Sequence, residues 1–181
     1  MLTEWRGFLN KIQCEGLIAA TDGLLTPAET LGGEQVRIAE SCWLDDSHDM
    51  ARGLKAYLYM HLSLPIHKME PVQIVKYKTG GEYKPHVDYM SFADEGDRIR
   101  EAMRGGQRVQ TVLVYLNDDY VGGETVFTAA GLTIKPEAGK LVLWDNVRED
   151  GWGDPESEHA GLPVTGTKWI ALVWVRQGEW R

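Results

Sequence analysis

The stretch KWIALVWVR, residues 168–176, is the most apolar strand-like run of the chain, and it opens with a lysine. RVQTVLVYL (108–116) and VQIVKY (72–77) have the same character, rich in the β-branched and aromatic residues that favour strands. Further short runs follow from Pro71 onward, separated by Gly, Asn and Asp: EYKPHVD (82–88), ETVF (124–127), LTIKP (132–136), KLVLWDN (140–146) and a run near His159. Roughly eight short strands predict a jelly roll, a double-stranded β-helix of the cupin-like type.

The chain before this β region has a helical pattern. Apolar residues recur at helical spacing over residues 5–19 and again over 46–62, where Asp46 or Ser47 is the expected N-cap. We therefore expect a mostly β protein whose N-terminal helices pack outside the jelly roll.

The length predicts one domain. At 181 residues the chain can bury a proper core without disulfides or metals. Within a single domain, 1–181, we expect a helical N-terminal support over 1–70 and the jelly-roll core over 71–178. FADEGDRIREAMR (92–104) interrupts the β pattern and is expected to be a helical or mobile insertion.

Charge and cysteine content narrow the function classes. The net charge of −8 and the pI near 5.1 disfavour nucleic acid and anionic membranes as partners. Cys14 and Cys42 lack metal-type spacing and are expected to be reduced structural thiols, which suits a cytoplasmic chain. The charged N-terminus does not resemble a signal peptide, and no apolar run approaches the ~20 residues of a membrane span.

YKPHVDYM (83–90) contains the residue pair that could carry chemistry. On a strand, His86 and Asp88 point to the same face, which fits either two ligands of a metal site or a surface salt bridge. His159 follows an acidic, Gly-containing loop, and Lys168 opens the strand nine residues later. Two histidines and one carboxylate can form the facial triad of non-haem Fe(II) oxygenases. The other histidines are expected to be surface or helix-packing residues: His48, His61 and His67.

A family resemblance favours the metal site. Residues 71–176 resemble the catalytic domain of the prolyl 4-hydroxylases, within the 2-oxoglutarate- and Fe(II)-dependent dioxygenases, and the N-terminal helices also suit that family. The matching blocks are YKTGGEYKPHVD, RVQTVLVYLND, VGGETVF, KPEAGKLVLWDN and HAGLPVTGTKWIALVWVR. Their order and spacing make the match specific, because a chance HxD pair would not bring the other four blocks with it.

The resemblance implies a role for each matching residue. His86, Asp88 and His159 would bind Fe(II), and Lys168 would pair with the distal carboxylate of the co-substrate 2-oxoglutarate; these four are the predicted catalytic residues. The remaining predicted co-substrate residues line the same pocket or lie near the iron: Tyr77, Tyr115, Thr125 and Trp174. Ascorbate is expected as a possible reductant, and Trp152 as part of the substrate rim.

The implied activity is hydroxylation of prolyl residues in a peptide or protein to 4-hydroxyproline, with release of succinate and CO2, as in procollagen-proline 4-dioxygenases. The expected partners are a proline-containing peptide or protein and O2, with substrate choice set by residues 22–45 and 89–107. Three alternatives remain open from the sequence: hydroxylation of a free amino acid or other small molecule, a nucleic-acid demethylase, and a metal- or peptide-binding jelly roll without turnover.

Overall fold

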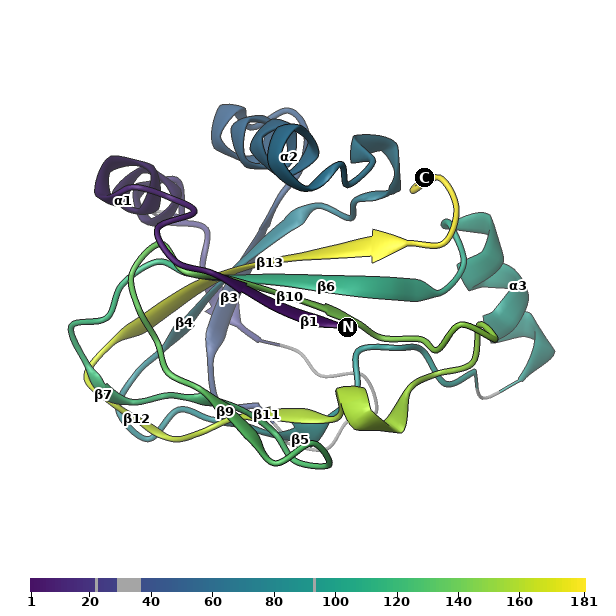
Figure 1. The fold of residues 1–181 in the computed structure, drawn as a ribbon. Helices are drawn as coiled ribbons and strands as arrows, with labels where there is room; N and C mark the ends of the chain where they lie inside the picture. Colours follow the sequence, from purple (N-terminus) through teal and green to yellow (C-terminus); the bar gives the residue numbers. More distant parts are fainter. Residues whose placement is uncertain (22, 29–36, 93) are drawn as a thin grey trace.

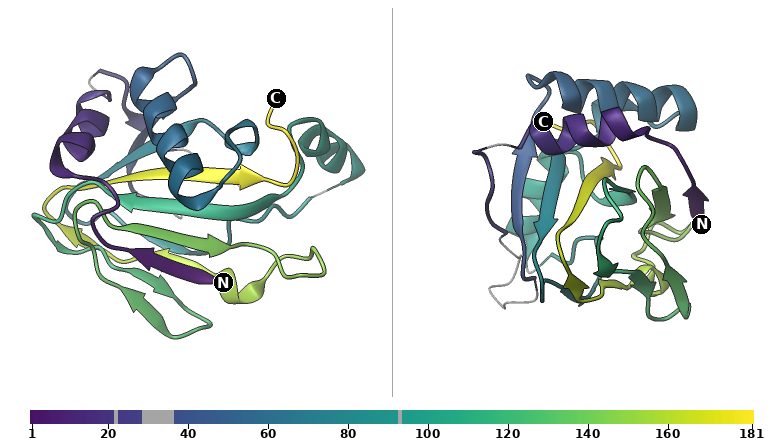
Figure 2. Two further views of the ribbon diagram at one scale, coloured as in Figure 1. Left: turned by 45° about the horizontal axis from the view of Figure 1, so that its top comes forward. Right: turned by 90° about the vertical axis from the view of Figure 1, so that its left-hand side faces the viewer.

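A computed structural model describes residues 1–21, 23–28, 37–92 and 94–181. Two antiparallel sheets face each other below a layer of helices (Figures 1 and 2). This arrangement confirms the predicted jelly roll with helices outside it.

The major sheet has seven strands and forms the floor between the helices and the interior of the barrel. Its strands, in spatial order, are β1 (Leu2–Trp5), β10 (Leu141–Asp145), β6 (Arg108–Tyr115), β13 (Lys168–Arg176), β4 (Val72–Tyr77), β3 (Glu40–Leu44) and β2 (Thr26–Pro27). The minor sheet has the order β5 (Tyr83–His86), β11 (His159–Gly161), β8 (Thr125–Phe127) and β9 (Leu132–Ile134). A short pair closes one end of the barrel: β12 (Val164–Thr165) and β7 (Val121–Gly122).

The helices are α1 (Lys11–Ala19), α2 (Asp49–Leu62) and α3 (Glu95–Met103), with short 3-10 turns at Ile66–Lys68 and Pro155–Ser157. α1 and α2 cover the outer face of the major sheet, and α3 lies beyond one end of its strands (Figure 1). Because α3 lies within 92–104, that segment is the helical insertion allowed for by the sequence. None of the helices in the described ranges is long and apolar enough to cross a membrane.

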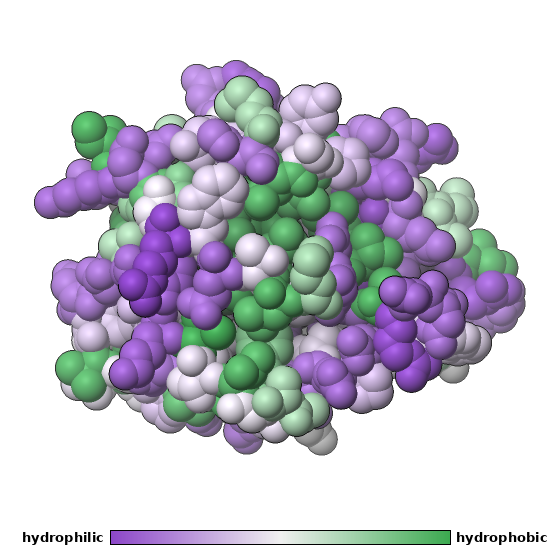
Figure 3. Space-filling model, viewed as in Figure 1, coloured by the Kyte–Doolittle hydropathy of each residue, from purple (hydrophilic) through white to green (hydrophobic). Residues whose placement is uncertain are grey.

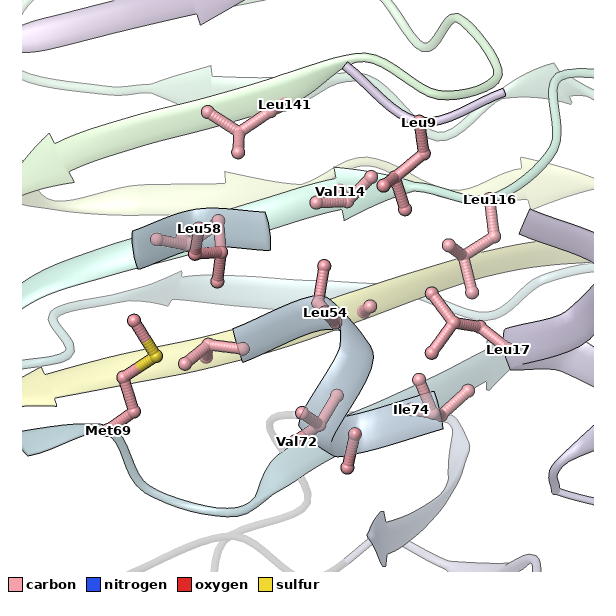
Figure 4. Close-up of a cluster of buried hydrophobic side chains, with 14 of the residues drawn as sticks. Leu9, Leu17, Leu54, Leu58, Met69, Val72, Ile74, Val114, Leu116 and Leu141 are labelled. Atoms are coloured by element: carbon pink, nitrogen blue, oxygen red, sulfur yellow. The ribbon is translucent and has the colours of Figure 1, made fainter. Parts of the chain in front are cut away.

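The position of β13 explains the near-continuous apolar run KWIALVWVR of residues 168–176. Its alternate side chains Ala171, Val173 and Val175 enter the core under the helices, while Ile170, Leu172 and Trp174 line the interior between the sheets. A strand buried on both faces has no polar face to alternate with. Figure 4 shows the helix-side core, where leucines of α2 lie over side chains of the major sheet.

The sequence pattern predicted a helical N-terminal part, but in the structure this part contains strands as well as helices. β1, β2 and β3 all join the major sheet, so the first part of the chain supplies strands as well as support. α1 begins only at Lys11, because Trp5 pairs with Leu141 in β1 and Asn10 forms a capping box with Gln13. The N-cap of α2 is His48, whose Nδ1 accepts from the Met50 amide, and not Asp46 or Ser47.

The face seen in Figure 3 has both polar and apolar areas. Figure 3 shows hydrophilic residues around the rim of one face, with apolar side chains in a band across its middle.

The two cysteines are buried and unpaired within the described ranges. Burial raises the pKa of both thiols, which fits the expected structural role.

Gly139 fixes the point where the N-terminal segment crosses the major sheet. Its carbonyl accepts from the Leu9 amide, and its φ of +77° lies in the left-handed region. A Cβ there would lie 2.0 Å from the Leu9 carbonyl oxygen. We expect Gly139→Ala to lower the free energy of unfolding by more than about 3 kcal/mol, because backbone strain and a clash with main chain add together.

Gly131→Ala is the matched control for this experiment. Gly131 also has a positive φ, +64°, but an added Cβ would meet nothing within 4 Å. Its expected cost is roughly 1–2 kcal/mol. Urea denaturation of both variants measures the difference, and equal losses would contradict the proposed close approach.

Candidate metal and co-substrate site

Three potential metal ligands converge at the edge of the minor sheet. His86 ends β5, Asp88 follows it, and His159 begins β11, directly opposite His86 in the antiparallel register. Their ligand atoms lie within 4.8 Å of one another, and this is the single cluster of its kind in the described ranges. The Asp88 carboxylate lies 3.8 Å from Nε2 of each histidine, too far for a hydrogen bond.

The alternative of a surface salt bridge does not fit this geometry. The His86 and Asp88 side chains are only 15% and 8% exposed. Both imidazoles instead point their Nε2 atoms inward at one carboxylate.

Hydrogen bonds outside the cluster orient each ligand. The Nδ1 atom of His86 lies 2.8 Å from the Lys84 carbonyl oxygen, and Nδ1 of His159 lies 2.9 Å from that of Ser157. A carbonyl accepts only, so each Nδ1 carries a proton, and in the neutral imidazole Nε2 then keeps a free lone pair. Carbonyl acceptors of this kind commonly orient the histidine ligands of a metal.

The carboxylate is oriented in the same way. Thr111 Oγ1 on β6 donates to Asp88 Oδ2 at 2.7 Å. Asn146 Nδ2 in turn donates to the Thr111 hydroxyl at 2.8 Å. Oδ1 of Asp88 is left free to bind a metal.

The electrostatics suit a divalent cation. Burial, followed by the neighbouring His159, lowers the pKa of His86 to about 4, so its imidazole is neutral at physiological pH. Burial alone would raise the pKa of Asp88, but the electrostatic interactions with His159, His86 and Arg108, together with the Thr111 hydrogen bond, outweigh it and lower that pKa. The cluster therefore offers one carboxylate oxygen donor and two imidazole nitrogens, a donor set that fits Fe(II) and leaves three coordination positions for other ligands.

A buried lysine lies at the other end of the same interior. Lys168 begins β13 and pairs with Tyr77 on β4. Its Nζ donates to the Gly123 carbonyl at 2.6 Å and lies 5.3 and 5.4 Å from the ring centres of Tyr77 and Tyr115. The side chain is 3% exposed, and burial lowers its pKa to about 8. A buried cation with one carbonyl partner calls for an anion.

The other predicted pocket residues surround this lysine. The hydroxyls of Tyr115 and Thr125 lie 2.6 Å apart and join the major sheet to the minor sheet. The Tyr77 hydroxyl accepts from Arg37 Nε at 3.3 Å. All three hydroxyl residues are buried.

Trp174 lies toward the metal cluster and not beside Lys168. It is six residues further along β13, on the same face, and it pairs with Thr111, the residue that holds Asp88. At ~3.3 Å per residue, this places Lys168 and Trp174 about 20 Å apart along the floor. Arg108 Cζ lies 4.0 Å from the Trp174 ring centre, and the half-exposed Trp43 ring lies 5.7 Å from it.

The sequence reading missed several charged residues of this interior. Arg37 is 7% exposed, and its Nη1 donates to Gln73. Glu70 accepts hydrogen bonds from Arg108 and Arg176, each at 2.6–2.9 Å. An arginine opening an apolar strand, as Arg108 does, was the available signal, since Lys168 stands at the same place in β13.

The buried polar atoms without a partner mark the interior as built for a polar guest. Among the described residues, these side-chain atoms are Arg37 Nη2, Tyr120 Oη, Trp144 Nε1, Asn146 Oδ1 and Trp174 Nε1. Each belongs to a residue of the inner core or to one bonded to the site residues. Buried polar groups are usually paired, so this concentration fits a pocket that takes a charged or polar molecule such as 2-oxoglutarate.

Comparison with known proteins decides the family. The sequence pattern of the 2OG-Fe(II) oxygenase superfamily matches residues 72–176. The chain is 31% identical to prolyl 4-hydroxylase 5 of Arabidopsis thaliana, over 98% of this chain and 68% of that protein. The chain belongs to the prolyl 4-hydroxylase family of the 2OG-Fe(II) oxygenases. It is accordingly a 2-oxoglutarate-dependent dioxygenase that uses Fe(II).

Other prolyl 4-hydroxylases and a solved structure agree. The chain is 34% identical to the rat prolyl 4-hydroxylase subunit alpha-1, over 79% of this chain and 27% of that subunit. The viral collagen prolyl hydroxylase of Paramecium bursaria Chlorella virus-1, solved as a 2OG complex, superposes with a TM-score of 0.73 at 28% identity, covering 97% of this chain and 95% of that one.

Removing one member of the cluster tests the metal site. We expect His159→Ala to weaken Mn(II) binding by more than about 100-fold, since loss of an outer-shell partner alone costs 10–100-fold. Isothermal titration calorimetry of the metal-free chain measures the affinity. His67→Ala, in an exposed residue outside the cluster, is the control and should bind Mn(II) like the wild type. Equal affinities in the two variants would remove His159 from the ligand set.

Proposed function

We propose that this chain hydroxylates prolyl residues of a peptide or protein to 4-hydroxyproline, with His86, Asp88 and His159 as the Fe(II) ligands. One observation carries the proposal: the His–Asp–His cluster and the buried Lys168 face one interior, in a fold shared with prolyl hydroxylases. Relatives named as prolyl 4-hydroxylases support the choice of proline as substrate.

Lys168 is proposed to bind the distal carboxylate of 2-oxoglutarate. A dicarboxylate that enters a buried pocket loses its hydration, and the ammonium group compensates for this loss. The Tyr77 and Tyr115 rings lie beside Lys168 Nζ, and the Tyr115 hydroxyl bonds that of Thr125. These three hydroxyls are proposed to complete the hydrogen bonds of the same carboxylate.

The chain's own part in the reaction is positioning. Bound Fe(II) and 2-oxoglutarate supply the oxidative chemistry, which uses O2, inserts oxygen into a C–H bond and releases succinate and CO2. Asp88 and the two histidines are held by hydrogen bonds before any ligand arrives. Ile170 and Leu172 form an apolar floor between the cluster and Lys168, which excludes water from the path between them.

Aromatic and cationic side chains surround the cluster where a substrate would approach. The Tyr83 ring stacks on His86, with centres 3.5 Å apart at 17°. The Trp43 ring packs against the Trp174 ring, and the Arg108 guanidinium lies over Trp174. Flat apolar rings next to hydrogen-bond donors suit a pyrrolidine ring flanked by peptide carbonyls.

Two segments are proposed to choose the peptide. The two ends of the second, 89–107, are tied together, because the Gln107 side chain bonds both the amide and the carbonyl of Met90, at 2.6 and 3.0 Å. Of the first, 22–45, the structure describes residues 23–28 and 37–45. Trp152 is 72% exposed, in the loop that contacts Tyr89 through Gly153, and stays a prediction for the substrate rim. Cytoplasmic location and a role for ascorbate also stay predictions.

Product mapping tests the activity. Incubation with Fe(II), 2-oxoglutarate and a proline-rich peptide should yield succinate and a peptide that has gained one oxygen atom on proline, measured by tandem mass spectrometry. His86→Ala should form no product. Hydroxylation of free proline in preference to the peptide would replace the proposed substrate class by the small-molecule alternative.

The pKa of Lys168 predicts how co-substrate affinity changes with pH. Because burial lowers this pKa to about 8, the ammonium loses its proton as the pH rises through that value. A dicarboxylate binds the protonated form, so affinity should be constant below about pH 8 and fall by up to about tenfold per pH unit above it. Calorimetry of 2-oxoglutarate binding to the Mn(II)-loaded chain measures the profile.

Lys168→Arg is the matched variant for the pH profile. A guanidinium keeps its charge throughout this pH range, so any affinity that remains should lose the downturn above pH 8. The same downturn in both proteins would show that another group titrates.

A further inference from the structure

Tyr120 enters the closed end of the barrel with its hydroxyl innermost. The residue lies just before β7 and is only half-buried as a whole, but its Oη is fully buried. The ring packs against the inner core, which includes Tyr77 and Tyr115. Within the described ranges, Oη has no hydrogen-bond partner.

Two glycines hold the ring beside Lys168. A Cβ on Gly123 would lie 3.0 Å from Tyr120 Cε2 and 3.0 Å from Lys168 Cδ, so both side chains pass over the same point. A Cβ on Gly166 would lie 3.1 Å from Tyr120 Cβ. The ring and the lysine stem therefore run side by side into the interior.

The hydrogen-bond donors at this end of the barrel suit an anion. The Lys168 ammonium has three N–H donors, and among the described residues it has one acceptor, the Gly123 carbonyl. Burial, followed by the nearby Tyr115 and Asp118, raises the pKa of Tyr120. Its hydroxyl therefore keeps its proton and is available as a donor.

Packing of the Tyr120 ring does not require its hydroxyl. A phenylalanine would fill the same space, and a buried hydroxyl without a partner costs about 1–3 kcal/mol by the general scale for such groups. The hydroxyl is accounted for when a bound molecule accepts its hydrogen bond.

We propose that the Tyr120 hydroxyl is a further co-substrate-binding group that donates a hydrogen bond to the distal carboxylate of 2-oxoglutarate. This inference rests on the proposed function, in which Lys168 binds the same carboxylate. Tyr120 then adds a donor to the cation and hydroxyls already assigned to that end of the pocket, and it contributes to co-substrate affinity without touching the metal.

The test measures binding and not turnover. Tyr120→Phe keeps the ring and removes only Oη, and Tyr59→Phe, in an exposed residue of α2, is the matched control. Calorimetry gives the affinities of each full-length variant for Mn(II) and, once it is loaded with Mn(II), for 2-oxoglutarate. Thermal unfolding of the metal-free proteins reports whether the aromatic ring at position 120 still packs. Lys168→Ala is measured alongside.

We expect Tyr120→Phe to bind 2-oxoglutarate about tenfold more weakly than the wild type, as for loss of a hydrogen bond to a charged group. Its Mn(II) affinity should be unchanged, and its melting temperature equal to or above that of the wild type. Unchanged 2-oxoglutarate affinity would overturn the inference, and so would a loss accompanied by weaker Mn(II) binding or a lower melting temperature, which would show a packing role. If Lys168→Ala also leaves 2-oxoglutarate affinity unchanged, the proposed co-substrate site fails as well; if Lys168→Ala loses affinity while Tyr120→Phe does not, only the role of Tyr120 fails.

Discussion

The pairing of β13 between β6 and β4 is the constraint on which this molecule depends. This one strand is buried on both faces, so it holds the helical layer against the sheet and also forms the floor of the site. Lys168 begins the strand at the end of the interior proposed for the 2-oxoglutarate carboxylate. Trp174 lies further along the strand, toward the metal cluster. A shift of its register by one residue would turn Lys168 toward the helices and remove the cation from the interior.

A second layer of charges connects the floor to the insertion that carries α3. Glu70 binds Arg108 and Arg176, and Arg176 also bonds Glu101 of α3. Arg108 in turn packs over Trp174. Buried ion pairs of this kind contribute less to stability than to a unique arrangement, because their desolvation offsets much of their attraction. Here the arrangement they specify is the place of the 89–107 segment relative to the metal cluster.

How much the sequence could predict depended on whether a signal was local. His86 and Asp88 could be paired from the sequence, since two residues apart on a strand share a face. That His159 would join them as a third ligand followed only from the family resemblance, because its pairing with His86 is a long-range contact. The strands β1 and β3 were missed because each is short and its partner is distant in sequence. Arg37 was missed because one charged residue beside a strand has no periodicity to reveal it.

The two histidines are oriented by the same local device. Each Nδ1 bonds to the carbonyl two residues earlier in its own chain, Lys84 for one and Ser157 for the other. Neither imidazole relies on a side chain from elsewhere to choose its tautomer. Main-chain carbonyls at two strand ends therefore set the direction of both donor nitrogens. The side chains of the surrounding loops can change without altering the orientation of these metal ligands.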